Sequence, residues 1–232
     1  MDGMLQSFEV AWAMIVAGND ELADIVILSL KTSLIATLIA SLMGLFLGIY
    51  LAVVKFRFRS LFVIIINAFM GLPPVVVGLV LYILLSNSGP LNFLNLLYTP
   101  LAMIIAQVIL ITPIIIGFSR EIFVGFLEEY EEQFLTLGLG NYQIALTIMI
   151  EARLRLYTVV AAGFGRAIGE VGAVMIVGGN IEHLTRVMTS AIVLETSRGD
   201  LNLALALGIL LVLISFFINA LVMVIRRFSE NN

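Results

Sequence analysis

Five apolar stretches, each at least 20 residues long and almost free of charge, divide the chain. They cover residues 25–54, 61–85, 100–119, 156–178 and 201–225. A helix needs about 20 apolar residues to cross a hydrocarbon core of roughly 30 Å, and in lipid the backbone has to satisfy its own hydrogen bonds. The pattern therefore predicts five membrane-spanning helices and an all-α integral membrane protein.

The first 24 residues follow a different pattern. Their apolar part, residues 10–18, is too short to span a bilayer and has acidic residues on both sides. This pattern predicts a helix that lies in the membrane interface. A sixth, short span and a cleaved signal peptide are the alternatives, and the basic start of a signal peptide is missing. We expect an interfacial segment at 1–24, a membrane domain at 25–227 and a tail at 228–232.

Basic residues near the ends of the spans predict the orientation. The side of the membrane that is richer in Lys and Arg is the cytoplasmic one. With five spans, this rule places the N-terminus outside and the C-terminus in the cytoplasm. The cytoplasmic set is Lys55, Arg57, Arg59, Arg120, Arg153, Arg155, Arg226 and Arg227, and the outer set is Arg186 and Arg198.

The composition supports a membrane protein and excludes several functions. Of the 232 residues, 61% are hydrophobic and only 12% are charged, against about 25% charged in soluble domains. With no Cys and one His, thiolate chemistry and a multi-histidine metal site are excluded. A net charge of −4 disfavours nucleic acid. The sequence has no phosphate-binding glycine loop, so ATP would have to be used by another chain. We expect no metal and no cofactor here.

The stretch between the third and fourth spans, about residues 128–155, has the most informative polar pattern. Four glutamates within five positions precede two glycines, and an apolar run at 142–150 follows. This order is typical of a short helix that docks into a groove of another protein, and an interfacial loop is the alternative. The docking candidates are Glu131, Glu132, Leu137, Gly138, Gly140, Asn141 and Tyr142.

Prolines interrupt two of the spans. Pro73 and Pro74 remove two backbone donors, so we expect the second span to bend there. Freed carbonyl groups at this depth would line a wet path, and a packed kink is the alternative. Pro113 has the same interpretation in the third span. The candidates for the path or its gate are Asn67, Pro73, Pro74, Gln107, Thr112 and Pro113.

Arg166 and Glu170 are charged residues within the fourth span. Their four-residue spacing places them on one helix face, where they can pair, and each alone would be costly in hydrocarbon. We interpret them as a structural or gating pair, with a substrate contact and a proton relay as alternatives. A stripe of small residues on the adjacent face predicts close helix packing: Ala161, Gly165, Gly169 and Ala173.

The outer loop at 179–200 holds the remaining candidates. Apolar residues at helical spacing over 184–192 predict a short helix on the membrane surface. We expect Arg186 and Arg198 either to meet acidic groups of a delivery protein or to be solvated. His183 is interpreted as a surface residue.

Several of these residues resemble the permease subunits of ABC importers. Glu132 and Gly138 have the spacing of the cytoplasmic loop through which such permeases contact their ATPase. The stretches 71–78 (Gly-Leu-Pro-Pro-Val-Val-Val-Gly) and 165–173 (Gly-Arg-Ala-Ile-Gly-Glu-Val-Gly-Ala) resemble the molybdate, tungstate and sulfate branch of the type I permeases. The stretches 178–181 and 185–196 are most similar to tungstate permeases.

This resemblance implies a type I ABC importer transmembrane domain with five spans and an N-terminal interfacial helix. The implied function is ATP-driven import of an oxyanion, with tungstate favoured and molybdate or sulfate as alternatives. The implied partners are a second copy of the chain, two ABC ATPase subunits that hold ATP and Mg²⁺, and an extracytoplasmic oxyanion-binding protein. The implied location is a prokaryotic cell membrane, and the chain is a transporter subunit, not an enzyme.

A self-contained channel or secondary transporter is the competing function. It predicts chains of titratable residues within the membrane or an inverted repeat, and the sequence has neither. An intramembrane enzyme would need a nucleophile and a base, for which we find no credible constellation.

Overall fold

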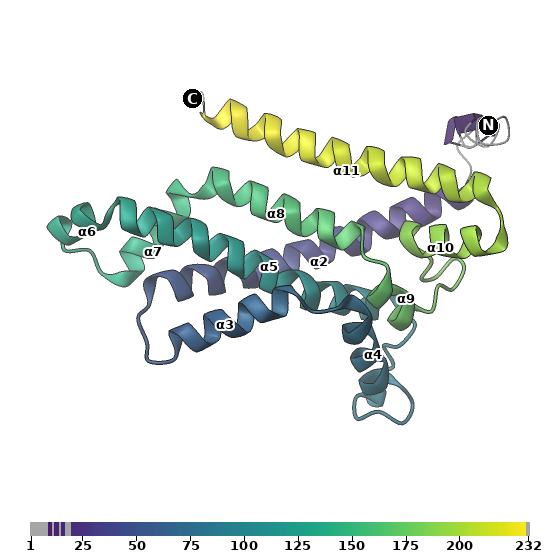
Figure 1. Ribbon diagram of the computed structural model, residues 1–232, viewed down its shortest axis with the longest axis horizontal. Helices are drawn as coiled ribbons and strands as arrows, with labels where there is room; N and C mark the ends of the chain where they lie inside the picture. The colour runs from purple at the N-terminus through teal and green to yellow at the C-terminus, as the bar shows by residue number, and fades with distance from the viewer. Residues whose placement is uncertain (1–8, 11, 14, 17–19, 231–232) are drawn as a thin grey trace. The chain divides into compact units, whose positions relative to one another are not determined.

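A computed structural model describes residues 9–10, 12–13, 15–16 and 20–230 (Figure 1). All regular structure in these residues is helical, which confirms the predicted fold class. The predicted interfacial helix at 1–24 falls mostly on residues outside the described ones. The helices are α2 (Asp20–Val53), α3 (Arg59–Met70), α4 (Pro74–Leu85), the 3₁₀ turn η1 (Asn92–Leu94), α5 (Pro100–Glu129), α6 (Glu131–Leu137), α7 (Asn141–Glu151), α8 (Arg153–Ile168), α9 (Gly172–Gly178), α10 (Met188–Arg198) and α11 (Leu201–Glu230).

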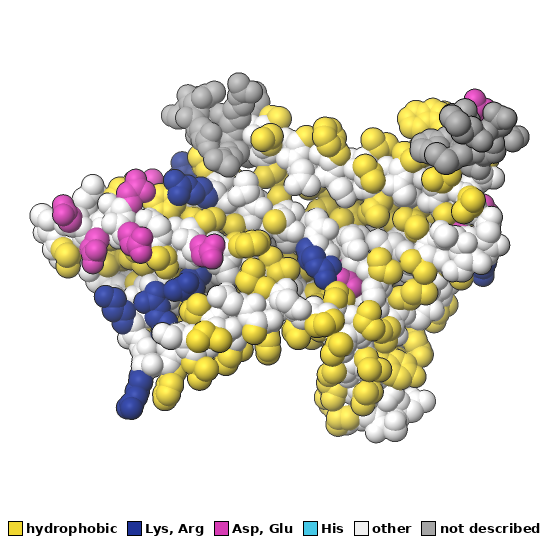
Figure 2. Space-filling view, in the orientation of Figure 1, with side chains coloured by type: hydrophobic (Ala, Val, Ile, Leu, Met, Phe, Trp, Pro, Cys, Tyr) yellow, Lys and Arg dark blue, Asp and Glu magenta, His cyan; other side chains and the backbone are white. Residues whose placement is uncertain are grey.

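Among the described residues, three helices are each long and apolar enough to cross a membrane: α2, α5 and α11. The total rises to five if α3 with α4, and α8 with α9, each count as one bent span. The helix α11 continues to Glu230, into the tail expected at 228–232. Hydrophobic side chains cover much of the face seen in Figure 2. The five predicted spans are therefore present only if two of them are broken.

The first break, between α3 and α4, lies where the two prolines predict it. Pro73 has an extended backbone, with φ −65° and ψ 123°, and Pro74 is the first residue of α4. Neither residue has an N–H to donate to the preceding turn, whereas the first position of a helix needs none. The predicted interruption of the second span is confirmed.

The second break, between α8 and α9, departs from the prediction of one continuous span. The helix α8 ends at Ile168 and α9 begins at Gly172, so Glu170 lies between them. The Glu170 carboxylate accepts the Ala173 N–H at 3.1 Å, and the Glu170 carbonyl oxygen accepts the Thr189 hydroxyl at 2.8 Å. Because these bonds replace helical ones, the expectation of a single small-residue face from Ala161 to Ala173 is wrong.

The chain forms two compact units. Unit 1 comprises Met1–Ala36, Pro73–Gln107 and Gly165–Ile218, and unit 2 comprises Thr37–Leu72, Val108–Phe164 and Asn219–Asn232. Within unit 1, α4 and α9 are in such close contact that a Cβ atom at Gly78 would stand 2.8 Å from the Ala173 Cα. Ser29 of α2 accepts the Met188 N–H at 2.8 Å, which ties α2 to the start of α10 in the same unit.

The predicted surface helix of the outer loop exists as α10, but its position differs from the expectation. It begins at Met188, and Met188 and Ala191 are completely buried. Ser190 fixes the start of the helix, because its hydroxyl accepts the Val187 N–H at 3.1 Å and donates to Asn180 Oδ1 at 2.8 Å. The prediction of a helix lying on the membrane surface from residue 184 is therefore wrong.

Candidate coupling segment and translocation path

The predicted docking segment consists of the two short helices α6 and α7. Gly138 ends α6 with a φ of 61°, a left-handed conformation that glycine adopts without steric cost. Its N–H bonds back to the Leu135 carbonyl oxygen at 3.2 Å. At the start of α7, Gln143 Oε1 accepts the Gly140 N–H at 3.0 Å. The two glycines thus separate an acidic helix from an apolar one, in the order that the sequence predicts.

A buried core within unit 2 anchors this segment. Phe134 of α6 and Ile148 of α7 are buried in it. Tyr130, which joins α5 to α6, stacks on Phe126 with the ring centres 6.1 Å apart and the planes within 4°. The Arg155 guanidinium carbon lies 4.8 Å from the centre of the same Phe126 ring. The remaining core residues come from α2, α5, α8 and the residue before α8: Ile49, Ala52, Val53, Phe123, Ala152 and Leu156. The segment is a packed part of unit 2, not a loose loop.

The same helices leave large apolar side chains uncovered. Leu135, Leu137 and Tyr142 are 75%, 69% and 80% exposed, and Leu146 and Ile150 are about half exposed; we call these five residues the α6–α7 apolar set. The other docking candidates are exposed as well: Glu131, Glu132, Gly138, Gly140 and Asn141. Acidic side chains gather over this end of the protein (Figure 2). Exposed apolar side chains beside such charges suit a protein partner better than lipid.

The path candidates are divided between the two units. Pro73, Pro74 and Gln107 belong to unit 1, and Asn67, Thr112 and Pro113 to unit 2. Gln107 is buried and donates from Nε2 to the Ala167 carbonyl oxygen at 3.0 Å, beside Arg166 in sequence. Thr112 donates to the Val108 carbonyl oxygen at 2.7 Å within its own helix. Pro113 lies buried inside α5, which remains helical through it, and Asn67 is exposed on α3.

Arg166 and Glu170 form the predicted ion pair, although Glu170 lies outside the helix that was expected to hold both. Arg166 Nη1 donates to Glu170 Oε2 at 2.5 Å. The Arg166 side chain is 35% exposed and the Glu170 side chain 3% exposed. Since the other carboxylate oxygen accepts the Ala173 N–H, Glu170 connects the end of α8 to the start of α9. The Glu170 carboxylate is thus buried, with both oxygens accepting hydrogen bonds, whereas the Arg166 guanidinium is partly exposed.

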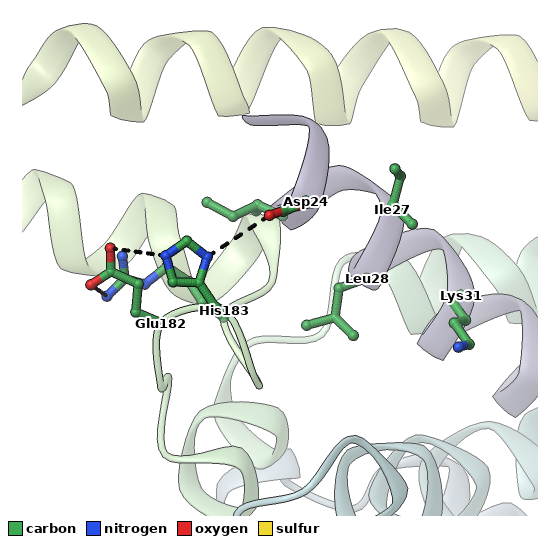
Figure 3. A pocket seen from close by; sticks show the side chains of 8 residues that line it. Asp24, Ile27, Leu28, Lys31, Glu182 and His183 are labelled. Atoms are coloured by element: carbon green, nitrogen blue, oxygen red, sulfur yellow. Dashed lines mark ion pairs between the residues drawn. The ribbon is translucent and has the colours of Figure 1, made fainter. Parts of the chain in front are cut away.

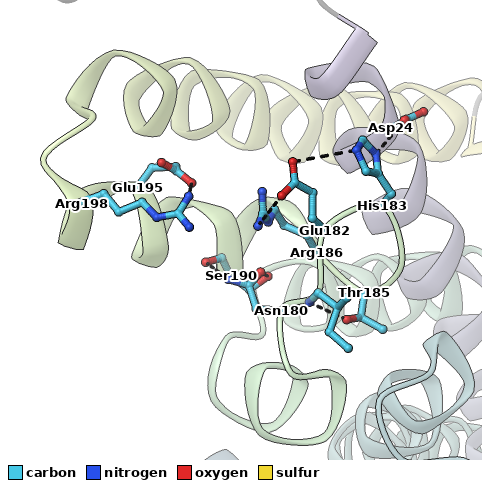
Figure 4. A network of polar contacts seen from close by, with 10 residues as sticks. Asp24, Asn180, Glu182, His183, Thr185, Arg186, Ser190, Glu195 and Arg198 are labelled. Atoms are coloured by element: carbon cyan, nitrogen blue, oxygen red, sulfur yellow. Dashed lines mark hydrogen bonds and ion pairs between the residues drawn. The ribbon is translucent and has the colours of Figure 1, made fainter.

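The outer-loop arginines differ from each other (Figure 4). Arg198 is exposed and donates to Glu195 at 3.0 Å. The Arg186 side chain is only 8% exposed, and its Nη2 lies 3.6 Å from Glu182 Oε2. Arg186 is therefore not solvated, contrary to one of the two expectations, while a contact of Arg186 or Arg198 with a delivery protein stays a prediction. In the turn before α10 the Arg186 N–H donates to the Ile181 carbonyl oxygen at 3.0 Å, and this turn brings Glu182 and Arg186 together.

An open cavity of about 270 Å³ lies beside this turn (Figure 3). His183 is exposed, as predicted, with its Nδ1 3.8 Å from Asp24 Oδ2 and its Nε2 3.9 Å from Glu182 Oε1. Its φ of 58° is uncommon for a residue other than glycine. No sequence pattern predicts this cluster, because Asp24 and His183 are far apart along the chain. Within the described ranges, no group of three His, Asp or Glu side chains could hold a metal ion.

Broken apolar spans and a packed α6–α7 segment with exposed apolar side chains fit a multi-pass membrane permease. The chain belongs to the family described as binding-protein-dependent transport system inner membrane component, whose profile matches residues 44–231. This finding confirms the resemblance to ABC importer permeases noted in the sequence. Such permeases are transporter subunits, not enzymes, and the family implies an ATPase and a binding protein as partners.

Named relatives are similar over nearly the whole chain. The tungstate uptake system permease protein TupB of Peptoclostridium acidaminophilum is 42% identical over 222 residues, which are 96% of this chain and 97% of that protein. The protein of the same name from Campylobacter jejuni is 35% identical over 98% of this chain and 95% of its own length. A probable anion ABC transporter permease protein of Haloferax volcanii is 39% identical over 70% of this chain and 72% of its own length.

Proposed function

We propose that this chain is the membrane subunit of an ATP-driven oxyanion importer, that it works as a homodimer, and that two ATPase subunits bind at α6–α7. The observation that carries the proposal is that some side chains of this segment are buried in the core of unit 2 while others are exposed. Phe134 and Ile148 hold it in the core of unit 2, while the α6–α7 apolar set remains uncovered. A groove on another protein would bury that set and gain the corresponding hydrophobic free energy.

The proposed substrate is tungstate. The two relatives described as tungstate permeases align over 96% and 98% of this chain, at 42% and 35% identity. A molybdenum permease of Azotobacter vinelandii is 29% identical over half of this chain, and a sulfate permease of Escherichia coli is 28% identical over 73% of it. Molybdate and sulfate are the competing substrates, because all three are tetrahedral dianions.

The proposed orientation places α6–α7 and the C-terminus in the cytoplasm and the N-terminus outside. The basic residues that flank the spans support it, since cytoplasmic ends carry the excess of Lys and Arg. ATP would then be on the same side as α6–α7. A soluble oxyanion-binding protein would deliver its ion to the opposite side.

The test of coupling is the double substitution Leu137→Ala with Tyr142→Ala. Both side chains are exposed, so the variant should insert normally but lose most of the ATPase that co-purifies with it, and lose ATP-dependent tungstate uptake in membrane vesicles. Val212→Ala on α11, which is also exposed and apolar, is the matched control and should retain both. Unchanged ATPase binding by the double variant would overturn the docking role.

The test of substrate and class uses the unaltered assembly in liposomes. Tungstate uptake should require ATP, the ATPase and the loaded binding protein, and excess tungstate should compete better than molybdate or sulfate. Uptake by the chain alone, driven by an ion gradient, would identify a self-contained transporter instead.

A further inference from the structure

We propose that Arg166 is a binding residue for the oxyanion on its way through the membrane, and that Glu170 is the positioning residue that holds its guanidinium in place. This inference rests on the proposed function. It is carried by the asymmetry of the pair within unit 1: the guanidinium is 35% exposed, whereas the carboxylate is 3% exposed.

The bonding of the two groups is equally asymmetric. Glu170 uses one carboxylate oxygen for Arg166 Nη1 and the other for the Ala173 N–H. A guanidinium has five N–H groups. Among the described residues, the hydrogen bond recorded for the Arg166 guanidinium is the one to Glu170. The remaining edge of the Arg166 fork is available to a ligand.

The surroundings of Arg166 on the chain are open. A Cβ atom added at Gly165 would meet nothing within 4 Å, and one at Gly169 would meet only the Gly165 carbonyl oxygen, at 3.3 Å. Gly165 and Gly169 therefore place no side chain next to Arg166 along the chain, and the guanidinium itself is 35% exposed. An arginine within a membrane span faces water or protein and not lipid, because contact with hydrocarbon is too costly, and Arg166 lies in the fourth predicted span.

The chemistry of the pair suits an oxyanion in transit. The planar fork of arginine matches the oxygen atoms of tetrahedral anions. The buried carboxylate makes the pair neutral overall and leaves the partly exposed guanidinium as its positive end. Such a site attracts a dianion without the deep well that an unpaired arginine would create, and transport requires binding weak enough for release.

The first experiment separates binding from structure in the complete assembly of permease, ATPase and binding protein in liposomes. Arg166→Gln with Glu170→Gln keeps the polar contact but removes both charges. It should retain ATP hydrolysis stimulated by the loaded binding protein and lose about tenfold in tungstate uptake at low concentration. Arg166→Lys should retain more uptake than this double variant, because it keeps the charge.

A purely structural pair predicts a different result, namely that the neutral double variant transports tungstate at the normal rate, and that result would overturn the inference. If the unaltered assembly moves no oxyanion at all, the proposed function fails together with the inference. If the unaltered assembly and the double variant both take up tungstate at the normal rate, the inference fails and the proposed function stands.

The second experiment measures access directly and does not depend on transport rates. The chain lacks cysteine, so Arg166→Cys with Glu170→Gln carries a single thiol. A water-soluble, positively charged methanethiosulfonate reagent should modify it, millimolar tungstate should slow the modification, and the added positive charge should restore part of the uptake. Phe216→Cys on the exposed apolar face of α11 is the control and should not react. An unreactive thiol at 166 would show that this position is covered by lipid or by the second copy. A reactive thiol that tungstate does not protect would show that the ion does not bind there, and either result would overturn the inference.

Discussion

The α6–α7 segment and the segment at 179–198, which ends with α10, have similar sequence patterns but differ in whether their apolar side chains are buried. Each connects two spans and combines helical spacing of apolar residues with charges. In α6–α7, Leu137 and Tyr142 face outward, and only Phe134 and Ile148 are buried. In the other segment, Met188 and Ala191 are buried, and even Arg186 has little exposed area. Apolar periodicity therefore predicts a helix but not whether its apolar side chains are covered by the same chain.

The largest expected difference between the two segments is in packing. Met188→Ala should lower the free energy of unfolding by roughly 2–4 kcal/mol, because it leaves a cavity at a fully buried position. Leu137→Ala should change it by less than about 0.5 kcal/mol, since that side chain is exposed. Thermal unfolding in detergent measures both. Equal shifts for the two variants would contradict the contrast.

The next largest difference in the free energy of unfolding is expected from removing a side-chain hydroxyl group in each segment. Ser190→Ala removes the acceptor of the Val187 N–H and the donor to Asn180 Oδ1, so we expect a loss of about 1–2 kcal/mol. Thr136→Ala on α6 removes an exposed hydroxyl that donates to the Glu132 carbonyl oxygen and should have little effect. The same unfolding assay applies, and a neutral Ser190→Ala variant would show that the start of α10 is held by packing alone.

The glycine turn of α6–α7 should be the strongest local determinant in that segment. Gly138→Ala places a side chain at a φ of 61° and should be destabilising by about 1 kcal/mol. Gly140→Ala is the control, because Gly140 has a φ of −78° that any residue adopts. If both substitutions have the same effect on unfolding, the left-handed turn is not the reason for glycine at 138.

The smallest expected effect is at the ion pair of Arg186. Its partner carboxylate on Glu182 is exposed, so Glu182→Gln should change stability by less than about 1 kcal/mol. The effect should shrink further in 1 M salt, because the screening length falls to about 3 Å. A larger, salt-independent loss would mean that Glu182 is the main support of the buried guanidinium.

The sequence predicted the helical class, the long apolar helices α2, α5 and α11, and the break at Pro73 and Pro74. These features depend on local properties, namely hydrocarbon solubility and missing backbone donors. The second and fourth predicted stretches are each divided into two helices, and only the first of these breaks was predicted. The sequence predicted one short helix after a glycine break, which is α7, but not the separate acidic helix α6 or the left-handed conformation of Gly138 that ends it.

The second break and the burial of Arg186 were not predictable in this way. Glu170 interrupts its span because its carboxylate and carbonyl groups bond to Ala173 and Thr189. The Thr189 partner is distant along the chain, so no local pattern reveals it. The ion pair with Arg166 was predicted from a helical spacing that the structure does not contain, and it forms because the turn after Ile168 keeps the two side chains close.

The shared core beneath α6 and α7 has a mechanical consequence. Phe134 and Ile148 are wedged among side chains of α2, α5 and α8, and a close-packed interior resists compression. A force applied to this segment would therefore be transmitted to α2, α5 and α8 together, because no flexible connection separates the segment from them. The stacked rings of Phe126 and Tyr130 make the connection between α5 and α6 more rigid, and such a force would pass through this connection.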